Sequence, residues 1–163
     1  MEQQVKLVPY GVADFATVIE QNLYYVDKTM FIEKIEMQPS YLFLIRPRRF
    51  GKSLTLAMLE AYYDVRYADQ FDELFGHLYI GQHPTPIHNQ FLIMRFNFSE
   101  VSSNVNEVEE SFRLHCCGKL SDFVYRYEHL LGKDIWNVLD EKTQADPGAF
   151  LSSINTYATR KGD

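Results

Sequence analysis

The chain has 163 residues, of which 46% are hydrophobic and 23% charged, with a formal net charge of −6. This composition is typical of an ordinary globular domain and excludes a disordered chain. The acidic balance argues against direct nucleic-acid binding, and the lack of an apolar run of about 18 residues argues against a membrane span. The only cysteines, Cys116 and Cys117, are neighbours that form no disulfide framework, which predicts a reducing, cytoplasmic location.

The first forty residues carry signals for two short helices. Asp14 can cap the first helix. Residues 24–26 form a short extended stretch, after which Asp27 can cap a second helix that ends at the Gln-Pro-Ser break of residues 38–40. We therefore expect an N-terminal helical linker over about residues 1–40.

A strand, a loop and a helix are predicted to follow this break. The apolar run of residues 41–45 predicts a buried strand, residues 46–50 a loop, and residues 52–65 a helix that is buried on most sides. Gly-Lys-Ser at residues 51–53 occupies the junction between loop and helix. This placement is the context that a phosphate-binding loop requires.

The loop departs from the usual motif, Gly-x-x-x-x-Gly-Lys-[Ser/Thr], at its first position. Arg46 replaces the first glycine there, and Pro47 removes one N–H donor. The N–H groups of residues 50–53 remain, and they would do most of the cradling of phosphates. The alternative is an ordinary helix start, in which Gly51 permits the turn and Ser53 caps the helix.

The motif assigns a role to the side chains of this loop. Lys52 would contact the β and γ phosphates of ATP, and Ser53 would ligate Mg²⁺. Four of the 16 Lys and Arg residues lie within seven positions here, which suggests a local anion site, although a solvated basic turn gives the same pattern. The predicted nucleotide-contacting residues are Arg46, Pro47, Arg48, Arg49, Phe50, Gly51, Lys52, Ser53 and Leu54.

The rest of the chain predicts three more helices and a second strand. A short helix ends at Gly76, and the apolar residues 91–98 predict the strand. An apolar stripe with spacings of three and four predicts a long amphipathic helix over residues 104–131. The last helix is bounded by a cap, a first-turn proline and a stop glycine, which are Asp146, Pro147 and Gly162.

Three stretches of this sequence resemble the predicted AAA-ATPase-like proteins of bacteria. They are residues 24–29 (Tyr-Tyr-Val-Asp-Lys-Thr), residues 43–56, which contain Arg-Pro-Arg-Arg-Phe-Gly-Lys-Ser, and residues 62–64 (Tyr-Tyr-Asp). The resemblance covers essentially the whole chain and makes Arg46 a family variant. It implies an α/β fold of the P-loop NTPase type that binds ATP and Mg²⁺. Many such proteins carry a C-terminal PD-(D/E)xK nuclease-like domain, and roles in defence or mobile elements are suspected.

One part of an active ATPase is missing from the sequence. No apolar strand ends in the Asp or Asp-Glu that holds Mg²⁺ and activates water, because residues 91–98 lead into Ser99 and Glu100. The resemblance places that strand just after residue 163, so we expect residues 1–163 to be the N-terminal portion of the ATPase domain. This portion would contain strands 1 and 2 of an incomplete parallel sheet. We assign no catalytic residue, and we expect ATP hydrolysis only from the completed domain.

An incomplete sheet would leave the first strand without neighbours and expose a long apolar edge. We therefore expect marginal stability as an isolated monomer, with self-association or a partner chain that completes the sheet. Two other classes of function remain open. The chain can be a non-catalytic regulatory or interaction module without nucleotide binding, or part of a nucleic-acid-associated protein.

Two further groups of residues are candidates for binding. Tyr24 or Tyr25 can stack on a nucleotide base, although tyrosine packing in the core is the favoured role. His115, Cys116 and Cys117 suggest a metal site, but consecutive helical positions point about 100° apart and do not converge on one ion. Zinc is therefore not expected.

Overall fold

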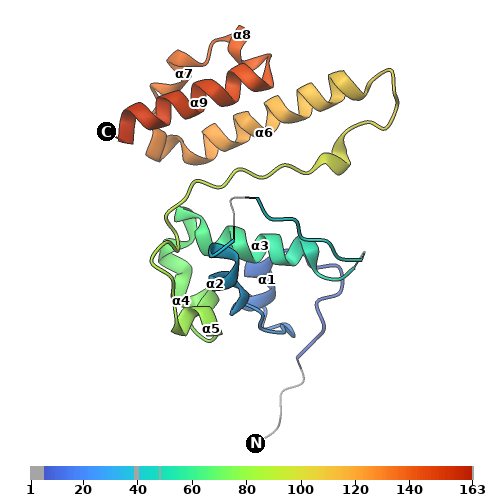
Figure 1. Ribbon diagram of the computed structural model, residues 1–163, viewed down its shortest axis with the longest axis vertical. Helices are drawn as coiled ribbons and strands as arrows, with labels where there is room; N and C mark the ends of the chain where they lie inside the picture. The colour runs from blue at the N-terminus through green and yellow to red at the C-terminus, as the bar shows by residue number, and fades with distance from the viewer. Residues whose placement is uncertain (1–5, 39–40, 48, 163) are drawn as a thin grey trace, which may run out of the picture. The chain divides into compact units, whose positions relative to one another are not determined.

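A computed structural model describes residues 6–38, 41–47 and 49–162, and the chain divides into two compact units, Met1–Leu92 and Ile93–Asp163 (Figure 1). The helices of the first unit are α1 (Phe15–Glu20), α2 (Phe31–Glu36), α3 (Lys52–Tyr63), η1 (Val65–Gln70), α4 (Phe71–Phe75) and α5 (Tyr79–Gln82). Those of the second unit are η2 (Phe98–Glu100), α6 (Val108–Leu131), α7 (Ile135–Val138), α8 (Glu141–Gln144) and α9 (Pro147–Gly162).

The core of the first unit is built around α3. Met58, Ala61 and Tyr62 recur at helical spacing on its buried face. The Tyr62 ring meets Phe75 of α4 edge-on at 5.5 Å between centroids, and Phe75 stacks on Phe15 of α1 at 5.0 Å. These ring contacts join α1, α3 and α4, so the loop that leads into α3 is attached to a packed element.

The second unit is a pair of long helices, α6 and α9, with α7 and α8 between them in the chain. Leu120, Phe123 and Tyr127 are buried on α6, and Phe150 and Ile154 are buried on α9. The short helices α7 and α8 carry the chain back, so α6 and α9 run in the same direction (Figure 1).

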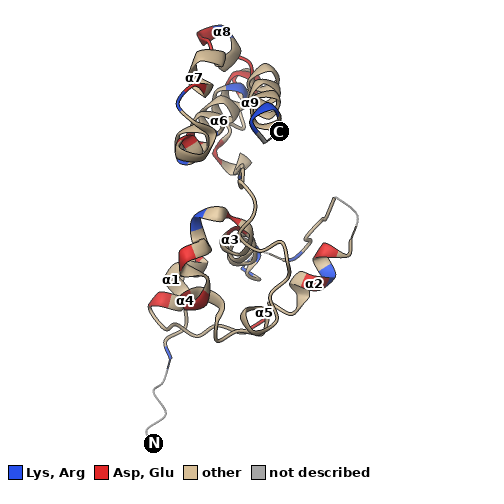
Figure 2. Cartoon of the chain, turned by 90° about the vertical axis from the view of Figure 1, so that its left-hand side faces the viewer, with Lys and Arg blue, Asp and Glu red and all other residues tan. Residues whose placement is uncertain are grey.

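Hydrogen bonds at both ends of this pair fix that arrangement. Near the start of the two helices, the Arg113 guanidinium donates to the Ala145 carbonyl at 2.7 Å. Near their ends, the Lys161 ammonium donates to the carbonyls of Leu130, at 3.1 Å, and Leu131. Lys161 belongs to the basic last turn of α9, which is blue beside the C-terminal label in Figure 2. A cation at the free carbonyls of a helix end is stabilising.

The helices that were predicted from caps and apolar spacing are confirmed. Asp14 accepts a hydrogen bond from the Thr17 N–H at 2.8 Å and begins α1, and Asp146 accepts one from Ala149 at 2.7 Å and begins α9. The helices predicted over residues 52–65 and 104–131 correspond to α3 and α6, with slightly later starts or earlier ends.

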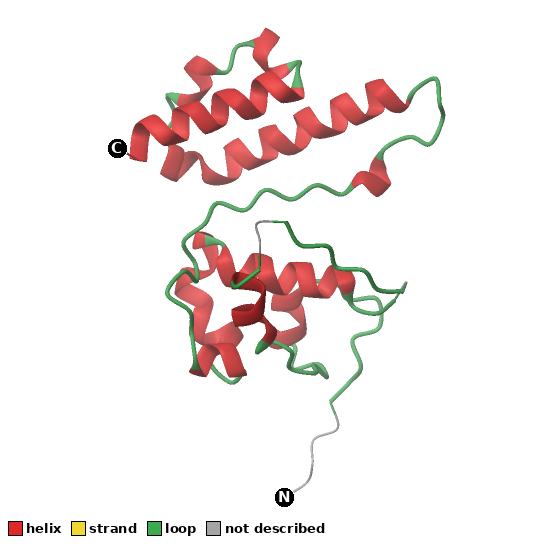
Figure 3. Cartoon of the chain, viewed as in Figure 1, coloured by secondary structure: helices red, strands yellow, loops and turns green. Residues whose placement is uncertain are grey.

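The prediction of an α/β sheet with strands at residues 41–45 and 91–98 is wrong. Figure 3 shows helices and loops for the described part of the chain. Ladder pairing among the described residues is limited to an isolated parallel bridge between Asp64 and Phe91. The first unit is therefore helical where the P-loop fold has a sheet.

The physical reason for residues 91–98 lies in the hydrogen-bond partners of their backbone groups. The Phe91 N–H donates to the Tyr63 carbonyl at 2.9 Å, so Phe91 pairs with the end of α3. The Ile93 N–H donates to the Tyr127 hydroxyl at 2.9 Å, and that hydroxyl lies 3.3 Å from the Ile93 carbonyl, which leaves neither group for a ladder. A strand needs a neighbour for its backbone groups, and apolar composition does not specify that neighbour.

Residues 41–45 form no regular structure, and their side chains alternate in exposure. Tyr41, Phe43 and Ile45 are 87%, 86% and 90% exposed, whereas Leu42 and Leu44 are less so. This period of two is that of an extended backbone without a pairing partner. The buried first strand that the sequence predicts is thus an exposed apolar segment.

The predicted cap of the second helix is also wrong. α2 begins at Phe31, and its N-cap is Met30, which makes no side-chain capping bond. The Asp27 carboxylate is engaged elsewhere, by Thr29 and by the backbone of Tyr79.

Candidate functional site

The loop before α3 has an unusual backbone. Gly51, the N-cap of α3, adopts φ 72° and ψ 20°, and Arg49 adopts φ 66°. Left-handed conformations alternating with others turn successive N–H groups toward a common concavity, which is the geometry of an anion-binding nest. An added Cβ at Gly51 would meet nothing within 4 Å, so the glycine is required by its backbone conformation and not by space.

Lys52, the first residue of α3, closes the loop on itself. Its ammonium donates a 2.9 Å hydrogen bond to the Arg46 carbonyl, six positions earlier. The Arg46 guanidinium lies 3.5 Å from the Phe50 carbonyl, at the limit of a hydrogen bond. Thr55 secures the first helical turn, because its N–H and hydroxyl both donate to the Gly51 carbonyl, at 2.8 and 2.9 Å. The lysine side chain is therefore held over the loop.

A pocket of about 580 Å³ borders this loop and the start of α3. It is lined on one wall by residues 8–13 and on the other by Arg49, Gly51, Lys52, Ser53 and Leu54. Its charged lining groups are Arg49 and Lys52, and no Asp or Glu belongs to its described lining. The pocket also meets the N-terminus of a 12-residue helix, whose free N–H groups and dipole favour an anion.

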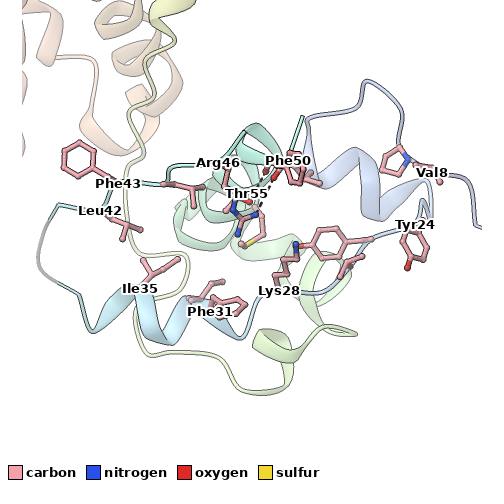
Figure 4. A pocket seen from close by; sticks show the side chains of 18 residues that line it. Val8, Tyr24, Lys28, Phe31, Ile35, Leu42, Phe43, Arg46, Phe50 and Thr55 are labelled. Atoms are coloured by element: carbon pink, nitrogen blue, oxygen red, sulfur yellow. Dashed lines mark hydrogen bonds between the residues drawn. The ribbon is translucent and has the colours of Figure 1, made fainter. Parts of the chain in front are cut away.

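A second pocket of about 550 Å³ also borders the loop (Figure 4). Its walls are mostly apolar and include aromatic rings, and its charged lining groups are Lys28 and Arg46. The two pockets share Val8, Pro9, Gly51 and Leu54 as lining residues, so they adjoin at the loop. The arrangement combines mostly apolar walls with a few charged side chains, as binding sites for small molecules often do.

A hydrogen-bonded latch holds the segment that carries Lys28. The Asp27 carboxylate accepts from the N–H and the hydroxyl of Thr29, at 2.8 and 2.7 Å, and from the Tyr79 N–H at 2.8 Å. The buried Thr29 hydroxyl in turn accepts from the Ile80 N–H at 3.1 Å. Asp27 and Thr29 thus satisfy the first N–H groups of α5, and Lys28 lies between two anchored residues.

The two tyrosines that precede the latch line the second pocket. Tyr25 is half-buried and packs edge-on against Phe15 at 5.4 Å, whereas Tyr24 is exposed. Burial raises the pKa of Tyr25 to about 12, and the nearby Asp27 carboxylate adds to the shift. Tyr25 therefore combines the predicted packing role with a place in the pocket wall.

The structure brings most of the predicted site residues around the two pockets. Arg49, Lys52 and Ser53 line the first pocket, Arg46 and Phe50 line the second, and Gly51 and Leu54 line both. Pro47 is exposed in the loop, and Arg48 lies outside the described residues.

Residues 8–13 and Lys28 are among the lining residues that the sequence did not assign to the site. Residues 8–13 contain no motif, so only the tertiary fold places them opposite the loop. Lys28 belongs to the Tyr-Tyr-Val-Asp-Lys-Thr stretch, and the resemblance of this stretch to the family was the sequence signal that could have pointed to Lys28 as a site residue.

The metal-like residues of the sequence lie on α6, in the second unit. His115 Nδ1 is 3.6 Å from a Glu100 carboxylate oxygen, Cys116 is buried, and burial raises the pKa of the Cys117 thiol. Both cysteines are free thiols. Within residues 6–38, 41–47 and 49–162, no group of three His, Cys, Asp or Glu side chains is placed to hold a metal ion.

Comparison with known proteins gives a family and a local match to a longer protein. A family model described as Predicted AAA-ATPase matches residues 9–163. A stretch of 55 residues is 49% identical to an uncharacterized protein in the vnfD 5′ region of Azotobacter chroococcum mcd 1. That stretch covers 33% of this chain and 11% of the Azotobacter protein, so the chain aligns with a small part of it. No solved structure matches the chain.

Among the described helices, none combines the length and apolar character needed to cross a bilayer.

Proposed function

Because this chain belongs to the AAA-ATPase-like family of predicted ATPases, we propose that it binds ATP with Mg²⁺ through the loop at residues 46–54. The observation that carries the proposal is the closed loop at the start of α3. Its lysine is folded over a backbone with two left-handed residues, and it faces a basic pocket whose described lining has no acid. Each feature favours an anion, and together they fit a chain of phosphates.

The proposed roles follow from chemistry and position. The N–H groups of Gly51 and its neighbours donate to phosphate oxygens, and the Lys52 ammonium exchanges the Arg46 carbonyl for the β and γ phosphates. The Ser53 hydroxyl, which lines the same pocket, would be the protein ligand for Mg²⁺, and the ion would neutralise phosphate charge. Arg49 adds a second positive charge to the same pocket.

The function proposed is binding, not turnover by these residues. Neither pocket beside the loop has a carboxylate among its described lining residues, and a water molecule that attacks a phosphate needs such a group to orient it. We propose a cytoplasmic setting, because Cys116 and Cys117 remain free thiols.

Titration with a fluorescent ATP analogue tests the proposal. We expect Lys52→Ala to weaken binding by roughly 10-fold or more, because charge-assisted hydrogen bonds to the phosphates are lost. Lys142→Ala removes the same charge from an exposed position on α8 that is not a described lining residue of either pocket, and we expect it to bind as the wild type does. Equal affinities of Lys52→Ala and wild type would refute the site.

A second candidate function is favoured by one specific observation. We propose that a second copy of the chain covers the exposed apolar residues 41–45, because Tyr41, Phe43 and Ile45 present a continuous apolar face to solvent. Self-association of this kind leaves the basic pocket uncovered, since none of these side chains lines it, whereas Phe43 also lines the apolar pocket.

A further inference from the structure

We infer that the apolar pocket beside the loop receives the purine base of the nucleotide, and that Lys28 determines which base is accepted. The expected consequence is that GTP binds at least as tightly as ATP. This inference rests on the proposed function, because the phosphates must sit at Lys52 for the base to reach the second pocket.

The position of the pocket supports this assignment. The two pockets adjoin at the loop and share four lining residues, so a ligand whose phosphates occupy the basic pocket can extend into the apolar one. Tyr24, Phe31 and Phe50 are exposed aromatic residues of its wall. Exposed rings in an apolar pocket offer stacking surface to a flat base, and stacking alone does not discriminate between bases.

Lys28 supplies the discrimination between purine bases. Its two neighbours in sequence are anchored to α5 by the latch, which fixes the backbone from which the side chain extends. Figure 4 shows the Lys28 side chain reaching into the pocket toward the loop. Among the described residues, the Lys28 ammonium has no hydrogen-bond or ion-pair partner, so its three N–H donors are available to a ligand.

The pocket is rich in donors and poor in strong acceptors. Lys28 and Arg46 only donate, whereas no Asp, Glu, Asn or Gln side chain belongs to its described lining. The side-chain acceptors are hydroxyl groups such as those of Tyr24 and Tyr25. A base therefore fits best when it presents acceptor atoms to the cationic side of the pocket.

The edges of the two purines differ in this respect. Guanine presents two neighbouring acceptors, N7 and O6, and lysine is one of the side chains that recognise this pair. Adenine presents the N7 acceptor beside an amino group, which is a donor and faces an ammonium unfavourably. The Lys28 side of the pocket consequently suits guanine at least as well as adenine.

Isothermal titration calorimetry of the full chain with unlabelled ligands tests this inference. The ligands are GTP, ATP and inorganic tripolyphosphate, each with Mg²⁺. We expect both nucleotides to bind at least about 10-fold tighter than tripolyphosphate does, because only they place a base in the pocket. We expect Lys28→Met, which keeps an apolar side chain of similar length, to weaken GTP binding about 10-fold and ATP binding by less than about threefold.

The controls separate this inference from the proposed function. Lys133→Met removes an equal charge from an exposed position in the second unit, and we expect it to leave all three affinities unchanged. Lys28→Met should bind tripolyphosphate as the wild type does, which also shows that it is folded. Lys52→Ala should weaken all three ligands.

Three outcomes overturn the inference. ATP binding about 10-fold tighter than GTP would contradict the donor-rich pocket. Tripolyphosphate binding as tightly as both nucleotides would show that the base makes no contact, while the phosphate site stands. If none of the ligands binds in a manner that depends on Lys52, the proposed function and the inference fall together.

Discussion

Asp27 connects two segments of the first unit that are 52 positions apart in the sequence, through its bond to the Tyr79 N–H. Burial raises the pKa of Asp27, but hydrogen bonds from Tyr79 and from the N–H and hydroxyl of Thr29 outweigh it, and the net pKa is lowered from 3.8. A carboxyl group with a lowered folded-state pKa stabilises the fold above its unfolded-state pKa. That stabilisation is lost as the pH falls through the folded-state value.

We therefore expect Asp27→Asn to lower the thermal midpoint near pH 7, corresponding to a loss of roughly 1–3 kcal/mol, because the amide cannot accept all three hydrogen bonds. The difference from wild type should shrink at an acidic pH below the lowered folded-state pKa, where the wild-type carboxyl group is protonated. Melting curves followed by circular dichroism at both pH values provide the measurement.

Asp69→Asn, at an exposed carboxylate in η1 of the same unit, is the control and should melt as the wild type does at both pH values. A deficit for Asp27→Asn that stays the same size at low pH would show that the ionised carboxylate is not what holds the latch.

The site could be predicted from the sequence at residues whose type encodes their geometry. Gly51 is one, since the sequence places it at the junction of loop and helix as the residue that permits the turn, and its backbone there is left-handed. Arg49 adopts a similar conformation, and its residue type gives no sign of it. Lys28 and residues 8–13 reach the site through tertiary packing, which a local motif does not describe.

At the scale of elements, helices could be predicted and strands could not. A helix satisfies its hydrogen bonds within one segment, so the Asp14 and Asp146 caps locate α1 and α9 from local sequence. A strand depends on a partner elsewhere in the chain. Residues 41–45 have the composition of a strand and lack that partner among the described residues, so the apolar pattern led to a wrong fold class.

The long helix α6 contains one weak position, Gly118. The glycine is exposed, and an added Cβ would meet nothing within 4 Å. We expect Gly118→Ala to stabilise the chain by about 1 kcal/mol, because alanine has the higher helix propensity and no steric cost arises. Chemical denaturation followed by helical circular dichroism measures the change.

Gly132→Ala, at the end of the same helix, should instead destabilise the chain. Gly132 adopts φ 88°, and a Cβ there would lie 2.7 Å from the Lys161 ammonium. Stabilisation by both variants, or by neither, would show that backbone conformation does not distinguish the two glycines.

At the scale of the whole molecule, the family match spans both compact units, because it runs from residue 9 to residue 163. The helical second unit is therefore as much a part of the family sequence as the loop is. The short motifs that revealed the resemblance all lie in the first unit, between residues 24 and 64. Nothing in them indicated the parallel pair of α6 and α9, because that arrangement depends on how α7 and α8 return the chain.

The exposed face of residues 41–45 predicts that the chain associates with itself. We expect the weight-average mass in sedimentation equilibrium to rise over a roughly hundredfold range of concentration, and the thermal midpoint to rise with it. Phe43→Ser should reduce this dependence, because it removes a large apolar group from the centre of that face.

Val105→Ser is the matched control, since Val105 is also about 85% exposed but lies in the second unit. It should associate as the wild type does. A wild-type mass that is the same at every concentration, together with a cooperative melt, would rule out self-association.

The hydrogen bond between the Lys52 ammonium and the Arg46 carbonyl affects how much side-chain entropy Lys52 loses when an anion binds. A free lysine loses up to about 2 kcal/mol of rotamer entropy when it is immobilised. Here that loss accompanies folding, since the side chain is already held in a bent conformer. An arriving oxyanion would replace one carbonyl oxygen as the acceptor and leave the lysine conformer nearly unchanged. The side chain is therefore preorganised, and binding costs less side-chain entropy than it would for a free lysine.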